Sequence, residues 1–373
     1  MELRKSGSGN DDLLLVSLFC GAGGLDEGFS QAGFRSSLAY DIEPSCVDTI
    51  RYNHDSITAF ERDLSEIEVG EITGHWIEHG SGSLSGLLGG PPCQSFSRSN
   101  VYKTDDDPRD TLPRHYARVL QGLNEEFELD FFVFENVPGL LDDEHRGLYR
   151  DFKKRVRDAG FLVSEGMLDA QYFGVPQERE RIFIVGLNKN RYPSRFKFPN
   201  QDKSKEPPTV EHAIGDLPKP VHYSRNLTPE DIQEQTGHPN HWCMRPKSKK
   251  FDSENDFLEP GTIKGRSFRT LAWDEPSYTV AYGHREVHVH PNCERRLSIF
   301  EAMRLQGFPD HYELRGNMSE QIDMISDAVA PPVARVLASQ IKAQVYGDET
   351  SSPSEEEPVG VQENGQLYIT TGT

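Results

Sequence analysis

The sequence predicts an α/β fold built on a mostly parallel, twisted sheet with helices on both faces. Residues 13–19 are a continuous apolar run and residues 127–134 are strongly apolar and aromatic, as is typical of strands buried on both faces of a parallel sheet. Each run is followed by a residue suited to ligand binding, Gly21 after the first and Glu135 after the second. Because the carboxyl ends of parallel strands meet at one edge of an open sheet, where such folds bind ligands, we expect both residues to face one crevice.

The first predicted strand leads into a corner that suits a bound cofactor. Gly21, Gly23 and Gly24 follow it directly, and residues 25–32 are expected to form a helix. Glycines let a ligand approach the backbone at the amino terminus of a helix. Asp41 follows a second short strand, where a carboxylate can accept hydrogen bonds from ribose hydroxyls. The glycine spacing departs from the dinucleotide pattern, so a tight strand–helix turn without a ligand explains this corner equally well when it is taken alone.

A third strand, residues 84–90, ends in Pro91, Pro92 and Cys93. The paired glycines and prolines end the strand and fix the backbone of the turn that follows. The cysteine is therefore expected at a strand tip, where a thiol can reach a substrate. The alternative is a small hydrophobic residue in an ordinary turn, since cysteine is buried more often than it is reactive.

The composition argues against a membrane span and against a disulfide-stabilised scaffold. The 373 residues contain no apolar run long enough to cross a bilayer, and residues 1–12 are too polar for a signal peptide. Five cysteines without regular spacing indicate reduced thiols and a cytoplasmic protein. The net charge of −20 is unusual for a protein that binds DNA. It fits either adaptation to high salt or an ordinary acidic protein, and a salt titration of activity separates the two.

Residues 191–296 differ from the rest of the chain in charge and in periodicity. They contain 17 lysines and arginines against 15 aspartates and glutamates, although the chain as a whole is acidic. Regular periodicity fades here, which predicts a small, irregular second domain. A structural zinc site is a weaker alternative, because no Cys-x-x-Cys pair is present. Its candidate ligands are His238, His241, Cys243, His284, His288, His290 and Cys293.

Residues 297–345 are expected to complete the domain that residues 12–190 begin. Ser298 and Glu301 have the spacing of a capping box at the start of a helix. A later helix, after a pair of prolines, places its apolar residues on one face. Residues 346–373 hold six acidic residues and no basic ones, and we expect them to form a disordered acidic tail.

Five motifs together resemble those of the DNA (cytosine-5) methyltransferases, which transfer a methyl group from S-adenosylmethionine to carbon 5 of cytosine. The resemblance extends from about residue 13 to about residue 341. It implies a Rossmann-like, S-adenosylmethionine-dependent methyltransferase domain, with residues 191–296 as the target-recognition domain. The motifs are Phe19-Cys20-Gly21-Ala22-Gly23-Gly24, Gly89-Gly90-Pro91-Pro92-Cys93-Gln94-Ser95, Phe134-Glu135-Asn136-Val137, Gln177-Glu178-Arg179-Glu180-Arg181 and Glu301-Ala302-Met303-Arg304-Leu305-Gln306-Gly307-Phe308-Pro309.

The resemblance implies a cofactor pocket around the glycine corner. Asp41 would contact the ribose and Ile42 would pack on the adenine. Asp63 would contact the adenine amino group. Asp327 stands where the family usually has asparagine, so it is expected to weaken or alter the contact there. The implied cofactor residues are Phe19, Gly21, Gly23, Gly24, Leu25, Asp41, Ile42, Asp63, Leu64, Pro92, Asp327 and Val329.

The same resemblance assigns the catalytic residues. Cys93 would add to C6 of the cytosine, which makes C5 nucleophilic, and Glu135 would be the acid at N3. Arg181 would donate to O2, and Arg179 would lie nearer the backbone phosphates. The base must leave the duplex to be reached. Residues 105–110 would close over the DNA, with a solvated charged loop as the alternative.

The implied partner is double-stranded DNA, bound by a monomer in the cytoplasm or nucleoid, and a restriction endonuclease for the same site is a further candidate partner. Three rival functions remain open: an RNA cytosine-5 methyltransferase, an inactive DNA-binding relative and a methyltransferase for small molecules. Intact Cys93 and Glu135 argue against the inactive relative, and the small-molecule enzyme leaves the irregular insert unexplained. The candidate DNA contacts are Lys247, Lys249, Lys250, Arg266, Arg269 and Arg285.

Overall fold

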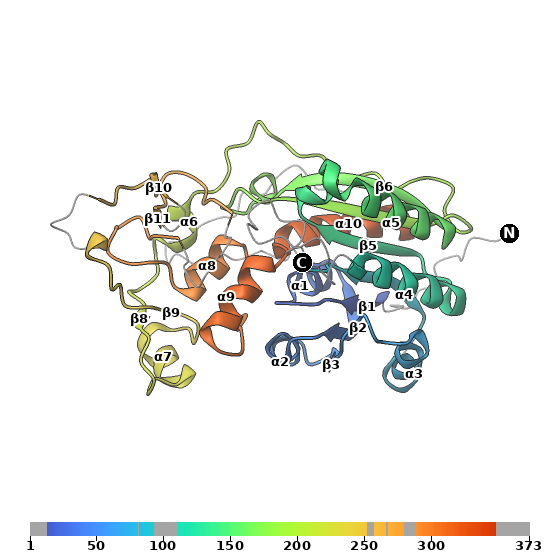
Figure 1. The fold of residues 1–373 in the computed structure, drawn as a ribbon, viewed down its shortest axis with the longest axis horizontal. Coiled ribbons are helices and arrows are strands. Elements are labelled where there is room, and N and C mark those ends of the chain that lie inside the picture. The colour runs from blue at the N-terminus through green and yellow to red at the C-terminus, as the bar shows by residue number, and fades with distance from the viewer. Residues whose placement is uncertain are drawn as a thin grey trace, which may run out of the picture.

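The computed structural model describes residues 13–80, 82–92, 111–251, 257–265, 268–279 and 288–347, and its centre is a seven-stranded sheet (Figure 1). The strand order is β3-β2-β1-β4-β5-β7-β6. The first five strands pair in parallel, which confirms the predicted α/β class. The strands are β1 (Leu13–Leu18), β2 (Phe34–Asp41), β3 (Thr58–Glu61), β4 (Leu84–Gly89), β5 (Phe131–Asn136), β6 (Phe161–Asp169) and β7 (Glu180–Asn188).

The strand β7 is the exception to the parallel arrangement. It runs antiparallel to both of its neighbours, β5 and β6. In its register with β5, Glu135 is opposite Phe183 and Asn136 is opposite Ile182. The start of β7 therefore lies beside the carboxyl end of β5.

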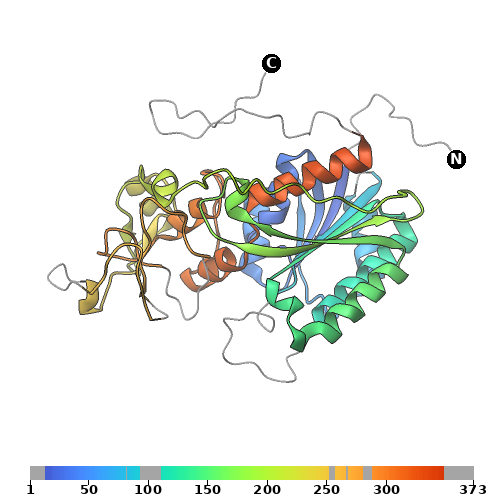
Figure 2. The ribbon, with the colours of Figure 1, turned by 90° about the horizontal axis from the view of Figure 1, so that it is seen from above.

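Helices cover both faces of the sheet (Figure 2). On one face α1 and α10 pack against apolar side chains that include Phe131 and Val133. On the other face α3, α4 and α5 pack against Phe132 and Phe134. Alternate residues of β5 thus enter two separate cores, as expected for a strand that is buried on both sides. The helices are α1 (Gly24–Gln31), α2 (Pro44–Asn53), α3 (Val69–His79), α4 (Leu112–Phe127), α5 (Arg146–Asp158) and α10 (Pro331–Tyr346).

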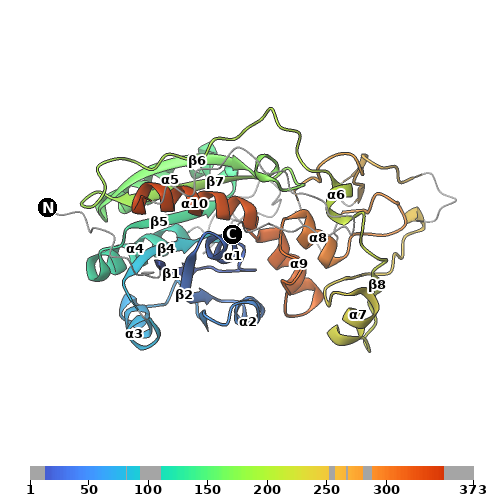
Figure 3. The same ribbon diagram turned by 180° about the vertical axis from the view of Figure 1, so that it is seen from behind.

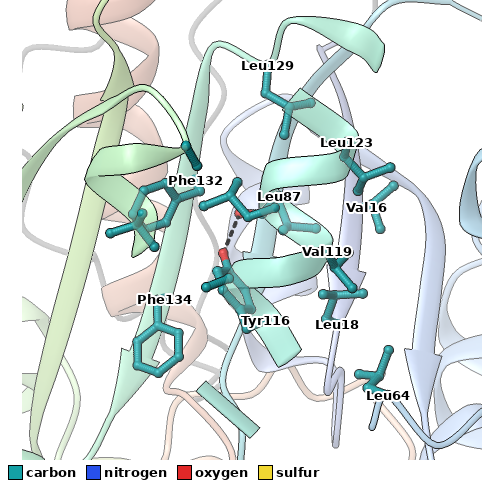
Figure 4. Close-up of a cluster of buried hydrophobic side chains, with 14 of the residues drawn as sticks. Val16, Leu18, Leu64, Leu87, Tyr116, Val119, Leu123, Leu129, Phe132 and Phe134 are labelled. Atoms are coloured by element: carbon teal, nitrogen blue, oxygen red, sulfur yellow. Dashed lines mark hydrogen bonds between the residues drawn. The ribbon is translucent and has the colours of Figure 1, made fainter. Parts of the chain in front are cut away.

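The helix α4 shows how the sequence makes this packing. Tyr116, Val119 and Leu123 are spaced as one helical face and are all buried (Figure 4). The Tyr116 hydroxyl lies in the core, and it donates to the carbonyl oxygens of Leu87 at 3.2 Å and of Val133 at 2.9 Å. Because its polar end is satisfied by two neighbouring strands, this tyrosine fixes α4 against the seam between β4 and β5.

The segment 191–296 lies beside the sheet domain, and its described residues form only short elements (Figure 3). Its apolar side chains join one cluster with those of α8 (Ile299–Leu305) and α9 (Met318–Asp327), so these two helices connect it to the sheet domain. The described elements are α6 (Val210–Ile214), β8 (Val221–His222), α7 (Pro229–Thr236), β9 (Trp242–Cys243), β10 (Ile263–Lys264) and β11 (Phe268–Arg269).

The predicted capping box at the start of α8 is present. The Ser298 hydroxyl accepts from the Glu301 amide at 3.0 Å, and the Glu301 carboxylate accepts from the Ser298 amide at 2.7 Å. The helix α10 ends at Tyr346, whose hydroxyl donates to Asp130, so this residue belongs to the folded domain. Residues 348–373 of the expected tail lie outside the described residues. Among the described helices, none combines the length and the apolar character that a bilayer crossing requires.

Candidate active site

A cavity of about 680 Å³ lies at the carboxyl ends of β1, β2, β4 and β5. Its walls include residues of the β1–α1 loop, of the segment after β3 and of the end of α9. The cavity therefore occupies the sheet edge at which the sequence predicted a ligand crevice. Every predicted site residue that the structure describes lines it, with the exceptions of Gly23, Arg179 and Arg181. Cys93 and the loop 105–110 lie outside the described residues.

The glycine corner is shaped by backbone geometry. Gly21 and Gly23 have φ of +53° and +77°, which favour residues without a Cβ. A Cβ on Gly24 would overlap the carbonyl oxygen of Val329, and one on Gly23 would overlap the Tyr312 hydroxyl. By contrast, a Cβ on Gly21 would meet nothing within 4 Å, because this residue borders the open cavity. Gly23 and Gly24 thus allow the strand–helix corner to pack tightly, whereas Gly21 exposes its backbone to the cavity.

Asp41 holds this corner from the end of β2. Its carboxylate accepts from the amide of Gly21 at 2.8 Å and from the amide of Glu43 at 3.0 Å. Burial raises the pKa of Asp41, and the two amide hydrogen bonds act in the opposite direction. The side chain of the neighbouring Ile42 is 55% exposed, so an apolar surface is available beside the carboxylate.

Asp63 and Leu64 differ in what they offer to the cavity. The Asp63 carboxylate accepts from the amide of Ser65 at 2.8 Å, which fixes its orientation at the cavity wall. Leu64 borders the cavity but is 3% exposed and packs into the core beneath it (Figure 4). Asp63 therefore presents a polar group to a ligand, while Leu64 mainly supports the wall.

Glu135, the predicted acid, is buried at the end of β5. Its Oε1 lies 3.1 Å from Nε of Arg181, and the two side chains are 7% and 12% exposed. Burial raises the pKa of Glu135, and the charges of Arg181 and Arg179 oppose that shift. A Cβ on Gly90 would lie 2.9 Å from Oε2 of Glu135, so the glycine at this position leaves room for the carboxylate.

Asn136 connects the end of β5 to the turn that leads to Cys93. Its Nδ2 donates to the carbonyl oxygen of Pro91 at 3.1 Å, and its Oδ1 accepts from the amide of Val137 at 2.9 Å. Pro92 lines the cavity. The chain is thus held beside Glu135 up to Pro92, the last described residue before Cys93.

Arg179 does not lie where the sequence placed it. The side chain is 1% exposed, and its Nη2 donates to the carbonyl oxygens of Ser326 and Ala328, both at 2.7 Å. The expectation that this residue lies near the DNA phosphates is not met by this structure, because the guanidinium group is enclosed in the protein. It fixes the turn at the end of α9 that carries Asp327.

Asp327 is open to the cavity from that turn. Desolvation of its carboxylate raises the pKa of Asp327, and the charges of Arg179 and Arg181 oppose that shift. Its charge in turn raises the pKa of Glu135. Two carboxylates and two arginines therefore interact on one side of the cavity, and each influences the protonation of the others.

The arginine segment is also tied to the irregular domain. The amide of Ser277 donates to Pro176 at 2.9 Å, and the amide of Glu178 donates to Ser277 at the same distance. The Thr279 hydroxyl donates to the carbonyl oxygen of Glu178. The residues just before β7 are thereby paired with a segment of the 191–296 insert.

Sequence reasoning did not include Gly90, Asn136 or Tyr312 among the site residues. The first two lie within the quoted motifs, so their position was visible but their contacts were not. Tyr312 donates to the carbonyl oxygen of Ala22 at 2.7 Å, across 290 residues of sequence, and no local pattern could indicate this contact.

The histidines proposed as zinc ligands make separate hydrogen bonds. His241 contacts Ser298 Oγ at 2.8 Å and the carbonyl oxygen of Pro218 at 2.7 Å, while Nε2 of His238 contacts the carbonyl oxygen of Tyr312. Within the described part of the chain, no group of three or more potential ligands is arranged to hold a metal ion. His284 lies outside it.

The predicted DNA contacts fall into different environments. Lys247 and Arg269 are exposed, whereas Nζ of Lys250 lies 4.4 Å above each of the rings of Phe257 and Phe268. Lys250 therefore contributes to the packing of the insert. Arg266 and Arg285 lie outside the described residues.

A family model, described as C-5 cytosine-specific DNA methylase, matches residues 13–343. The chain belongs to this family. It is 32% identical over 357 residues to the Type II methyltransferase M.MthTI of Methanothermobacter thermautotrophicus, with 89% of this chain and 98% of the relative covered. It is 30% identical to M.FnuDI of Fusobacterium nucleatum, with 88% and 94% covered.

Solved structures support the fold of this DNA methylase. A prophage-encoded DNA modification methyltransferase of E. coli superposes with a TM-score of 0.72 at 23% identity, covering 90% of this chain and all of the other. The S. pombe Dnmt2 methyltransferase superposes with a TM-score of 0.59 at 16% identity, covering 88% and 98%. The family model and the curated relatives confirm the predicted family, the enzyme class and the methylation of cytosine at C5 in DNA, and the solved structures confirm the fold.

Proposed function

We propose that the enzyme methylates a flipped-out cytosine in a specific duplex sequence by way of a covalent bond between Cys93 and C6. The observation that carries the proposal is the burial of Glu135 at the tip of β5, on the wall of the same cavity as the glycine corner. An acid for the base and a site for the methyl donor must share one cavity in this reaction. The interaction of Asn136 with Pro91, just before Cys93 in the chain, supports the placement of the nucleophile beside that acid.

The residues of the glycine corner fit S-adenosylmethionine as the methyl donor. Gly21 exposes its backbone, Ile42 offers an apolar surface, and Asp41 and Asp63 offer carboxylate oxygens to hydroxyl and amino groups. When it is bound, the donor supplies an electrophilic methyl group. The carboxylates would orient it, and the tight contact of Gly24 with Val329 would close one side of its site.

Glu135 and Arg181 would prepare the cytosine ring. Because burial raises the pKa of Glu135, the carboxyl group can hold a proton that it shares with N3 while the Cys93 thiolate attacks C6. Arg181 would donate to O2 and limit the charge that builds up on the ring. C5 would then take the methyl group, and the donor would leave as its neutral thioether. Loss of the C5 proton to a base or to water, with the C6–S electron pair returning to Cys93 as thiolate, would restore the aromatic ring.

The relatives are named Type II methyltransferases, so we further propose a restriction endonuclease as the partner of this enzyme. Bisulfite sequencing of DNA from cells that express the enzyme would identify the methylated sequence. Transcribed tRNA serves as the competing substrate in the purified reaction. Transfer to tRNA but not to duplex DNA would contradict the proposed substrate.

The covalent step can be tested by trapping. A duplex that carries 5-fluorocytosine at the identified site lacks the proton that must leave C5, so the adduct should persist and be located at Cys93 by mass spectrometry. A Cys93→Ala variant should form no adduct and should still bind the methyl donor. Normal turnover by that variant would refute the assignment of the nucleophile.

A further inference from the structure

The outer face of α5 carries a second, strongly basic groove of about 520 Å³. Arg146, Arg150, Lys153 and Arg157 follow one another along one side of the helix, at intervals of three and four residues, and line the groove together with Tyr149. Asp158 is the acidic residue of this lining. A concentration of cations on one helix face stands out in a chain whose net charge is −20.

Two of these arginines have no acidic partner among the described residues. Lys153 pairs with Glu165 at 2.8 Å, and Arg146 pairs with Asp143. Arg150 and Arg157 are exposed and form no ion pair with the carboxylates that the structure describes. Their charges are therefore available to an anion from outside.

Tyr149 gives the groove a further unsatisfied polar group. Its hydroxyl is buried and has no hydrogen-bond partner among the described residues. Nζ of Lys153 lies 5.0 Å above its ring, which keeps this lysine over the groove. Burial, and to a smaller extent the charges of Arg157 and Arg195, lower the pKa of Lys153.

The groove begins near the active-site edge of the sheet. β5 ends at Asn136 beside the cavity, and Leu141, from the 3₁₀ turn Pro138–Leu141 that follows, lines the groove. From Arg146 the helix α5 then runs back towards the end of the sheet that is away from the cavity (Figure 2). There the amide of Lys189, just beyond β7, donates to the carbonyl oxygen of Gly160. The basic stripe thus leads from the substrate side along the outside of the domain.

We propose that this groove binds the phosphates of the substrate duplex beyond the methylated site. The stripe from Arg146 to Arg157 is about 16 Å long at 1.5 Å per residue. Over that length one DNA strand presents about five phosphates. Guanidinium groups suit phosphate oxygens because two parallel hydrogen bonds can form. The proposal rests on the proposed function, in which duplex DNA is the substrate.

The acidic segment 348–373 of the chain is a competing occupant, but its attachment point disfavours it. It continues from α10, which packs on the face of the sheet opposite to α5. The segment would therefore have to pass around the sheet to reach the groove. A duplex that leaves the cavity would not, because the groove starts at the end of the sheet where the cavity lies.

The double variant R150Q/R157Q tests the proposal with two duplexes that carry the methylated site. One has about 12 base pairs and fills only the cavity region, and the other has about 40 base pairs, so that it also supplies flanking phosphates. For the long duplex, we expect the Kd to rise about tenfold and the slope of log Kd against log salt to fall by about 2, the value for two lost phosphate contacts. The Kd and kcat for the short duplex should equal those of the wild type.

A matched control removes two cations from the opposite face, as K197Q/R335Q, and should bind both duplexes like the wild type. Equal losses on both duplexes, no loss on either, or the same loss in the control would overturn the proposal. It would also be overturned if deletion of residues 348–373 tightened long-duplex binding in the wild type but not in the variant, because the groove would then hold the chain's own tail. Failure of the wild type to methylate either duplex would instead refute the proposed function.

Discussion

The two sides of the active-site cavity are built on different principles. The side formed by β1, α1 and β2 depends on backbone shape, with glycines whose replacement would overlap Val329 or Tyr312. The side formed by β5, β7 and the end of α9 depends on charge, with Glu135, Arg181 and Asp327 placed around one another. Binding of the donor and activation of the base are therefore separable, and substitutions on the two sides should affect different measurements.

The largest effect is expected for Glu135→Gln. The amide keeps the shape of the side chain but cannot share a proton with N3, so kcat should fall by about 10²- to 10⁴-fold. The Kd for S-adenosylmethionine, measured by calorimetry, should stay within about twofold because the glycine side is untouched. Glu180→Gln, at an exposed neighbouring residue, is the control and should leave kcat unchanged. A comparable loss of donor affinity in Glu135→Gln would show that the two sides are not separable.

Gly24→Ala should show the opposite pattern, with the main effect on the Kd for the donor and not on kcat. The new methyl group would overlap the Val329 carbonyl, which is backbone and cannot turn away, so the free energy of unfolding should fall by about 1–3 kcal/mol. The Kd for the donor should rise together with this loss. Gly74→Ala in α3 has open space around it and should be neutral or slightly stabilising in thermal unfolding. Unchanged donor binding in Gly24→Ala would contradict the role of backbone shape.

Arg179→Lys tests the internal role assigned to this arginine. A lysine keeps the charge but loses the paired donors to Ser326 and Ala328, so we expect a loss of about 1–3 kcal/mol in unfolding free energy. The salt dependence of DNA binding should not change, because no phosphate contact is removed. A salt slope that falls by about 1 would restore the phosphate contact that the sequence suggested.

Asp327→Asn should produce the smallest effect, a shift in the pH profile. The charge of Asp327 raises the pKa of Glu135, so its removal should lower that pKa. If protonated Glu135 is the active form, activity is present below its pKa and lost as the pH rises through it. The alkaline limb of kcat should therefore move to lower pH, by up to about one unit. A shift towards higher pH would contradict the coupling of the two carboxylates.

The sequence predicted best where strands are buried on both faces. The apolar runs of β1, β4 and β5 can form little else, so the positions of Gly21 and Glu135 at their ends followed from topology. The insert was predicted only as irregular, since two-residue strands such as β8 and β9 carry no periodicity.

The role of Arg179 could not be predicted in the same way. The motif indicated that an arginine is needed, but its partners Ser326 and Ala328 lie 147 and 149 residues further along the chain. Two arginines in alternate positions read equally well as a substrate contact or as a support. Only the contact of the Arg179 side chain with the end of α9 distinguishes these roles, and that contact is a property of the whole fold.

The reversed direction of β7 decides where the two arginines lie relative to Glu135. Because β7 enters the sheet at the edge where β5 leaves it, two arginines that come more than forty residues after the acid in sequence lie at its side. If β7 ran the other way, it could fill the same place in the sheet and bury the same apolar residues. The arginines would then sit at the far rim, and the enzyme would be a stable, inert protein.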